Sequence, residues 1–155
     1  MRTVNSWLNE YGESHKNKTN KFIHWVCVPA IVFSILGLFY SVKMPFYVLC
    51  YQINLGVMIS AVAFVYYFSL SPALSVGMFF YLLVCMLFAN LIESRGFIPL
   101  WPFSIIVFVL AWVGQYYGHK LEKGKKPSFL KDIQFLMIGP AWLMSFVYKK
   151  LGIGL

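Results

Sequence analysis

The chain has 155 residues, of which 60% are hydrophobic and 12% charged, and its mean hydropathy is +0.71. Soluble domains carry about one-quarter charged residues, so this composition excludes an ordinary soluble enzyme and indicates a single integral-membrane domain over residues 1–155. The formal net charge of +8 is then interpreted as attraction to anionic membrane lipid, and no nucleic-acid partner is expected.

The N-terminal tail, residues 1–20, is predicted to hold a short amphipathic helix that lies at the membrane interface. Its apolar residues recur at helical spacing: Val4, Trp7, Leu8 and Tyr11. The helix is expected to end near residues 12–15, and no apolar core of a cleavable signal peptide is present. The polar stretch 17–20 then breaks the chain, with Thr19 or Asn20 able to cap the next helix.

Long uncharged stretches predict the membrane spans. Four are long enough to cross, at residues 23–40, 46–69, 74–92 and 101–118, and a shorter fifth lies at residues 133–148. The second and third are divided at residues 69–72, because Pro72 cannot continue a helix. Gly139-Pro140 interrupts the fifth, which is expected either to cross or to re-enter. The predicted fold is all-α, a polytopic membrane helical bundle with four spanning helices, this fifth helix and the interfacial one.

The distribution of lysine and arginine predicts the orientation in the membrane. Four basic residues lie within residues 1–21 and five lysines lie in the loop over residues 119–132, whereas the loops on the opposite side hold only Lys43 and Arg95. The positive-inside rule places the tail and this loop in the cytoplasm. The host membrane is either the bacterial cytoplasmic membrane or the endoplasmic reticulum.

The chain has three histidines, His15, His24 and His119, and all three fall at the predicted cytoplasmic face. In one continuous helix, His15 and His24 would lie on opposite faces and roughly 13 Å apart. They can converge only if the chain turns at residues 17–20. Cys27 follows His24 by three residues and is a possible additional ligand.

The end of the fourth span carries a polar stripe, in which Gln115, His119 and Glu122 are spaced i, i+4 and i+7. Imidazole binds zinc, iron and copper, and a non-haem iron site needs a small set of histidines and a carboxylate with open positions. The three histidines and Glu122 are therefore candidate ligands. The alternative is that each histidine is an interfacial residue with an apolar body and a hydrated tip.

Two segments of the chain resemble a known family. Residues 20–29 (NKFIHWVCVP) and 112–122 (WVGQYYGHKLE), followed by Gly139-Pro140, are similar to the 2-hydroxy fatty acid dioxygenases, a membrane family formerly catalogued as a domain of unknown function. That family includes a fungal endoplasmic-reticulum protein that converts phytosphingosine-derived 2-hydroxy fatty acids to odd-chain fatty acids. The resemblance extends over nearly the whole chain.

The resemblance implies an Fe(II)-dependent dioxygenase whose substrates are a 2-hydroxy fatty acid and O2. Its reaction would be α-oxidation, which releases CO2 and a fatty acid one carbon shorter. It implies that the three histidines bind Fe(II), with Glu122 as a fourth ligand or as a group that orients an imidazole. Asn20 and Gln115 are expected to form hydrogen bonds around the ligands and not to bind the metal.

Two other functions remain compatible with the sequence. One is a non-enzymatic lipid-binding or transporter-like membrane protein, in which the histidines are interfacial. The other is a zinc-dependent membrane hydrolase that uses the same ligands. Motifs for a serine nucleophile elbow, a His-Glu-x-x-His zinc site, a P-loop and a dinucleotide site are absent.

Overall fold

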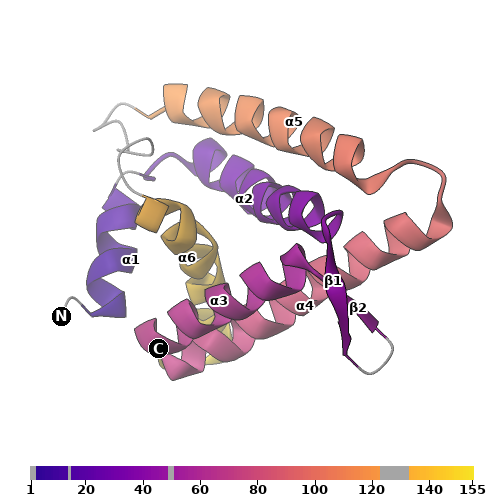
Figure 1. Cartoon of the computed structure of the whole chain (residues 1–155). Coiled ribbons are helices and arrows are strands. Elements are labelled where there is room, and N and C mark those ends of the chain that lie inside the picture. The colour runs from indigo at the N-terminus through magenta and orange to yellow at the C-terminus, as the bar shows by residue number, and fades with distance from the viewer. Residues whose placement is uncertain (1–2, 14, 49–50, 123–132) are drawn as a thin grey trace.

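The computed structural model describes residues 3–13, 15–48, 51–122 and 133–155, so most of the predicted basic loop lies outside the described residues. The described chain forms six helices and one two-stranded hairpin (Figure 1). In order, the elements are α1 (Val4–Glu13), α2 (Lys18–Tyr40), β1 (Lys43–Val48), β2 (Tyr51–Asn54), α3 (Leu55–Leu70), α4 (Pro72–Arg95), α5 (Leu100–Lys120) and α6 (Ile133–Leu151).

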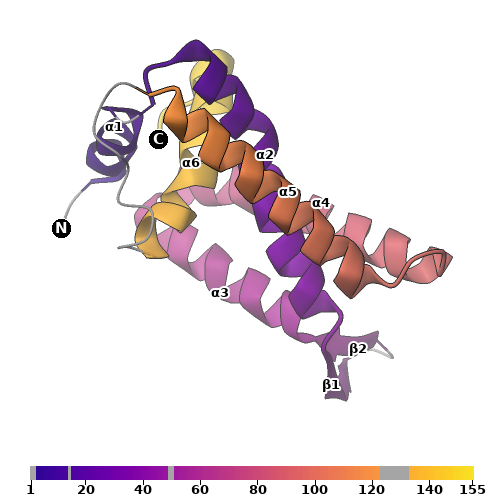
Figure 2. The same ribbon diagram turned by 90° about the horizontal axis from the view of Figure 1, so that it is seen from above.

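Helix α2 is the central element of the bundle. Helix α5 packs along it, and the paired helices α3 and α4 pack against it from another side (Figures 1 and 2). Helix α6 contacts α1, α2 and α4. Consequently α1, the start of α2 and the end of α5 meet at one end of the molecule (Figure 1).

Three helices of the described chain are long and apolar enough to cross a membrane: α2, α4 and α5. They coincide with the first, third and fourth predicted spans. The predicted division at residues 69–72 is confirmed, because Ser71 both ends α3 and caps α4. Its backbone N–H donates to the Tyr67 carbonyl, and its Oγ accepts from the Leu74 N–H at 3.2 Å. Pro72 then occupies the first turn of α4, where a missing N–H costs little.

The second predicted span is wrong at its start. Residues 43–48 and 51–54 form the antiparallel strands β1 and β2, and α3 begins only at Leu55. Asn54 sets this boundary, because its side chain accepts a hydrogen bond from the Val57 N–H at 3.0 Å. The aromatic and β-branched residues before Asn54 favour the extended conformation. Helix α3 therefore has 16 residues, fewer than the ~20 that a crossing needs.

The predicted interruption of the fifth segment at Gly139-Pro140 is also wrong. Helix α6 runs for 19 residues without a break, with Pro140 inside it. It is not one of the three described helices that are suited to spanning a membrane. The predicted count of four spans plus one is thus not confirmed: by length and composition, the described chain has three candidate spans, a short apolar α3 and a proline-containing α6.

The apolar face of α1 packs against α6. Val4, Leu8 and Tyr11 are buried there and form one cluster with Ile138 and Trp142 of α6. The helix predicted in the tail is present, but the face expected to lie in the membrane surface is covered by protein. This packing fixes the end of α1, and hence the residues that follow it, relative to the bundle.

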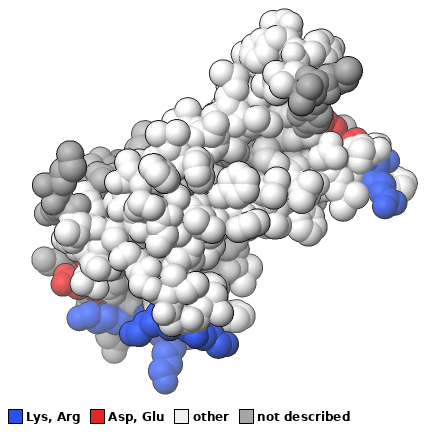
Figure 3. Space-filling view, turned by 90° about the horizontal axis from the view of Figure 1, so that it is seen from below, with Lys and Arg blue, Asp and Glu red and all other residues white. Residues whose placement is uncertain are grey.

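The charged side chains lie at the two ends of the molecule in the face shown in Figure 3, and the region between them carries none. At the end that includes the hairpin, Lys43 pairs with Glu93 at 2.6 Å. The apolar helices expose large side chains, such as Val62 of α3, which is 71% exposed. An apolar belt between two polar ends is the surface expected of a membrane protein.

Candidate metal centre

The three histidines come from three different elements. His15 lies in the linker after α1, His24 lies in the second turn of α2, and His119 lies in the last turn of α5. The linker is ended by Asn17, whose side chain accepts hydrogen bonds from the backbone N–H groups of Thr19 and Asn20. The cap is therefore Asn17 and not Thr19 or Asn20, and the chain turns slightly earlier than predicted.

The turn brings the three histidines together, as expected. One ligand nitrogen from each of them lies within 4.8 Å of the other two. The Nε2 atoms of His15 and His24 are 2.9 Å apart, and the His119 ring centroid is 5.5 Å from that of His15 and 5.0 Å from that of His24. His15 and His24 are fully buried, and His119 is partly buried.

Backbone carbonyls fix the orientation of two of the rings. His15 Nδ1 lies 2.7 Å from the Tyr11 carbonyl oxygen, and His24 Nδ1 lies 2.9 Å from the Asn20 carbonyl oxygen. A carbonyl only accepts, so each Nδ1 carries the proton and donates it. Each neutral Nε2 then presents a lone pair toward the other, which is unfavourable unless a proton or a metal ion lies between them.

Burial opposes the protonated alternative. It lowers the pKa of His15 below its ordinary value, although the Tyr11 carbonyl and the Glu122 carboxylate act in the opposite direction. A neutral imidazole at neutral pH is the form that binds a metal ion. His15 therefore offers a neutral nitrogen donor, and the rings of His15 and His24 are already oriented by backbone carbonyls.

Two aromatic side chains enclose His15. The Tyr11 ring stacks on the imidazole with centroids 4.3 Å apart and 13° between the planes, and the Trp142 ring lies 5.3 Å away. From the sequence, Tyr11 was placed only on the apolar face of α1, and Trp142 was not identified. The close spacing of Tyr11 and His15 in sequence was the one available signal.

Glu122 binds the start of α2. Its carboxylate accepts from the Asn17 N–H at 2.9 Å and from Asn20 Nδ2 at 2.8 Å, and Asn20 in turn provides the carbonyl that orients His24. Gly118 allows the end of α5 to lie this close to Asn20, because a Cβ atom at position 118 would be only 2.5 Å from Asn20 Oδ1. The Glu122 side chain thus ties the end of α5 to the start of α2.

Glu122 is not part of the three-histidine group found among the described residues. Partial burial raises its pKa, but the hydrogen bonds from Asn20 and Asn17 outweigh this, so the pKa lies below its ordinary value. Cys27 is also outside the group, because its sulfur faces Gly114 of α5, where a Cβ would lie 2.6 Å away. The structure thus brings together three of the candidate ligands.

Gln115 lies one turn before His119 on α5 and is only 3% exposed. Neither Nε2 nor Oε1 has a hydrogen-bond partner within the described part of the chain. It was expected to hydrogen-bond around the metal ligands, and no such bond is present. Its side chain instead lines a small cavity together with Tyr11 and Gly139.

The fold and the site define a class of protein: a helical membrane bundle with a buried group of three histidines suited to metal binding. The family described as 2-hydroxy-palmitic acid dioxygenase Mpo1-like matches residues 1–151, and the chain belongs to this family. It is 28% identical over 151 residues to the 2-hydroxy-palmitic acid dioxygenase MPO1 of Saccharomyces cerevisiae, an alignment that covers 96% of this chain and 82% of that protein. No solved structure matches the chain.

Proposed function

We propose that the protein is an Fe(II)-dependent dioxygenase that shortens 2-hydroxy fatty acids by one carbon. The main support for a metal ion is that the Nε2 atoms of His15 and His24 lie 2.9 Å apart. The Nδ1 protons of both rings are donated to backbone carbonyls, so neither Nε2 atom carries a proton. Two nitrogens that each lie about 2.1 Å from one ion, with an angle of about 90° at the ion, would be about 3.0 Å from each other. The distance between the two Nε2 atoms therefore fits ligation of one ion. The family and the named yeast relative support the substrate class.

The proposed reaction converts R–CHOH–COOH and O2 to R–COOH, CO2 and water. Loss of carbon 1 as CO2 and oxidation of carbon 2 to a carboxyl group release four electrons, which reduce one O2 completely. No further reductant is required. A bound Fe(II) would supply the one-electron chemistry that O2 needs.

The residues of this chain hold and shield the site. The carbonyls of Tyr11 and Asn20 keep the Nδ1 protons in place, so that Nε2 of His15 and of His24 stays available. The rings of Tyr11 and Trp142 cover His15 and exclude water from one side. Glu122 holds the Asn20 side chain, and with it the start of α2, against the end of α5.

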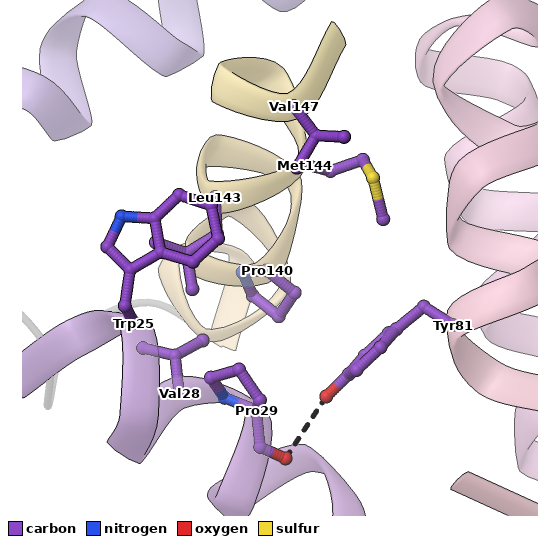
Figure 4. Close-up of a pocket in the computed structure, with 8 residues that line it drawn as sticks. All are labelled: Trp25, Val28, Pro29, Tyr81, Pro140, Leu143, Met144 and Val147. Carbon is purple, nitrogen blue, oxygen red and sulfur yellow. Dashed lines mark hydrogen bonds between the residues drawn. The ribbon is translucent and has the colours of Figure 1, made fainter. Parts of the chain in front are cut away.

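An apolar pocket beside the site is the proposed position of the acyl chain. It lies between α2, α4 and α6 and has a volume of about 110 Å³ (Figure 4). The Tyr81 hydroxyl donates to the Pro29 carbonyl oxygen at 3.1 Å across it, and Leu143 and Met144 of α6 form another wall. Val28 lines both this pocket and the cavity next to Gln115, so the two are neighbours.

Filling this pocket is expected to alter the preference for chain length. The variant Met144→Trp should lower turnover of 2-hydroxypalmitate several-fold and leave short-chain 2-hydroxy acids less affected, because only a long chain reaches the pocket. Competition between substrates of different length, followed by mass spectrometry, measures this ratio. A second apolar groove lies between α3 and α4 and is lined by Met86, so Met86→Trp is the control and should not alter the ratio. An unchanged ratio in Met144→Trp would exclude the pocket as the acyl site.

The proposed orientation places the histidines on the cytoplasmic side, in agreement with Lys16, Lys18 and Lys21 near them. In a cysteine-free background, a cysteine at Lys18 is expected to resist a membrane-impermeant thiol reagent in intact cells. A cysteine at Phe97, which is 86% exposed in the connection between α4 and α5, should react. The reverse pattern of labelling would invert the proposed topology.

The function is tested by incubating purified protein anaerobically with Fe(II) and 2-hydroxypalmitate and then admitting O2. We expect pentadecanoate and CO2 in equal amounts, and neither product without iron or without O2. Metal analysis of the purified protein separates an iron enzyme from a zinc hydrolase. Absence of iron-dependent one-carbon shortening over a range of chain lengths would refute the proposal.

A further inference from the structure

Gln115 is a buried polar side chain without a partner among the described residues. Its amide is almost completely shielded, and both Nε2 and Oε1 are unpaired. A buried amide in this state is unfavourable, and native proteins rarely retain one without a ligand or water to complete it. The side chain therefore points to a group that binds here.

The position of Gln115 connects it to the three histidines. It precedes His119 by four residues on α5, so the two side chains share a helix face and their Cβ atoms are about 5–6 Å apart. The cavity that it lines is also bounded by Tyr11, which stacks on His15. The remaining walls are apolar, including Val28, Ile31 and Leu136. A ligand held at the histidines would thus lie about one helical turn from Gln115 along α5.

The size and chemistry of the cavity select a hydroxyl group. Its volume is about 10 Å³, close to the minimum that holds one water molecule, so it admits a single oxygen atom. The amide offers one donor and one acceptor. A hydroxyl can satisfy both, whereas a carbonyl or carboxylate oxygen only accepts and a methylene group does neither. In a 2-hydroxy acid the hydroxyl is adjacent to the carboxyl group, so a carboxyl group held at the histidines would bring the hydroxyl toward Gln115.

We propose that Gln115 binds the 2-hydroxyl group of the substrate and thereby makes the site selective for 2-hydroxy acids over fatty acids that lack this hydroxyl. The inference rests on the proposed function and assigns its substrate specificity to one residue. Gln115 contacts the substrate and does not hold the metal. Val28 lines both this cavity and the proposed acyl pocket, so the two lie next to each other.

The test is a binding measurement without turnover. Iron-loaded protein in detergent is titrated anaerobically with 2-hydroxypalmitate and with palmitate, and tryptophan fluorescence or calorimetry gives the two affinities. In Gln115→Leu, we expect affinity for 2-hydroxypalmitate to fall roughly tenfold, the effect of losing a hydrogen bond, while affinity for palmitate changes less than about threefold. The variant should retain its full iron content and should fold at least as stably without ligand.

Ser104→Ala is the matched control, because Ser104 is a fully buried residue of α5 whose hydroxyl likewise lacks a partner in the described chain. It should bind both acids like the unchanged protein. A Gln115→Leu variant that keeps the preference for 2-hydroxypalmitate, or that loses iron, would overturn the inference. Failure of the unchanged protein to shorten 2-hydroxypalmitate would instead refute the proposed function, so the two failures are distinguishable.

Discussion

Replacing any one of His15, His24 and His119 with alanine is expected to remove bound iron and to abolish oxidation of 2-hydroxypalmitate. Each change leaves at most two nitrogen donors in a group whose ligand atoms lie within 4.8 Å of one another. Loss of a partner that only supports a ligand typically costs 10–100-fold in metal affinity, so loss of a ligand itself should exceed about 100-fold. Metal analysis and the oxygen-dependent assay measure the two effects.

The design of this experiment follows from the composition of the chain. Because the chain has only three histidines, the protein should be purified with a histidine-free tag, so that iron bound to a tag does not hide the loss. A second variant, His119→Gln, guards against misfolding, because it keeps a polar side chain at the partly buried position. Phe22→Ala is the control on α2, since Phe22 is 70% exposed near His24. Retention of stoichiometric iron and of activity in every histidine variant would refute the assignment.

The parts of the fold that could be predicted depend on local patterns. Uncharged stretches of sufficient length identified α2, α4 and α5, and the turn at Ser71-Pro72 was visible because proline and a capping serine act on their immediate neighbours. The N-terminal helix followed from its apolar spacing. These features need no knowledge of the rest of the chain.

The errors concern segments whose structure depends on more distant contacts or on competing local signals. The sequence of strands β1 and β2 is apolar enough to be taken as part of a span, and the capping role of Asn54 was not recognised. The partner of the apolar face of α1 could have been lipid or protein, and only the structure shows that it is α6. Similarly, Pro140 weakens α6 locally, but the helix continues within the packed bundle.

The candidate site likewise has features that could be predicted from local sequence and features that could not. The convergence of His15 and His24 could be inferred, because a continuous helix excluded it and a polar break allowed it. The contribution of Trp142 could not be inferred, since it depends on how α6 packs beside α1. The unpaired state of Gln115 also depends on three-dimensional packing. Glu122 could be selected by its spacing, but the spacing alone did not distinguish a ligand from a supporting residue.

Variants of Glu122 are expected to distinguish these two roles. The carboxylate accepts from the Asn17 N–H and from Asn20 Nδ2, and we infer that it supports His24 through Asn20. Glu122→Ala removes both bonds and should weaken iron binding by roughly 10–100-fold. Glu122→Gln keeps an amide oxygen that can accept from either donor, so a supporting role predicts a loss of only a few-fold, whereas a ligand role predicts a loss as large as in the alanine variant.

Iron affinity measured by competition with a chelator gives the ratio between the two Glu122 variants. Glu13→Gln is the matched control, because Glu13 is exposed at the end of α1 and close to His15 in sequence. It should leave iron affinity unchanged. Equal and large losses in Glu122→Ala and Glu122→Gln would show that the carboxylate binds the metal directly, and the bond pattern described for Asn17 and Asn20 would then have to rearrange when iron binds.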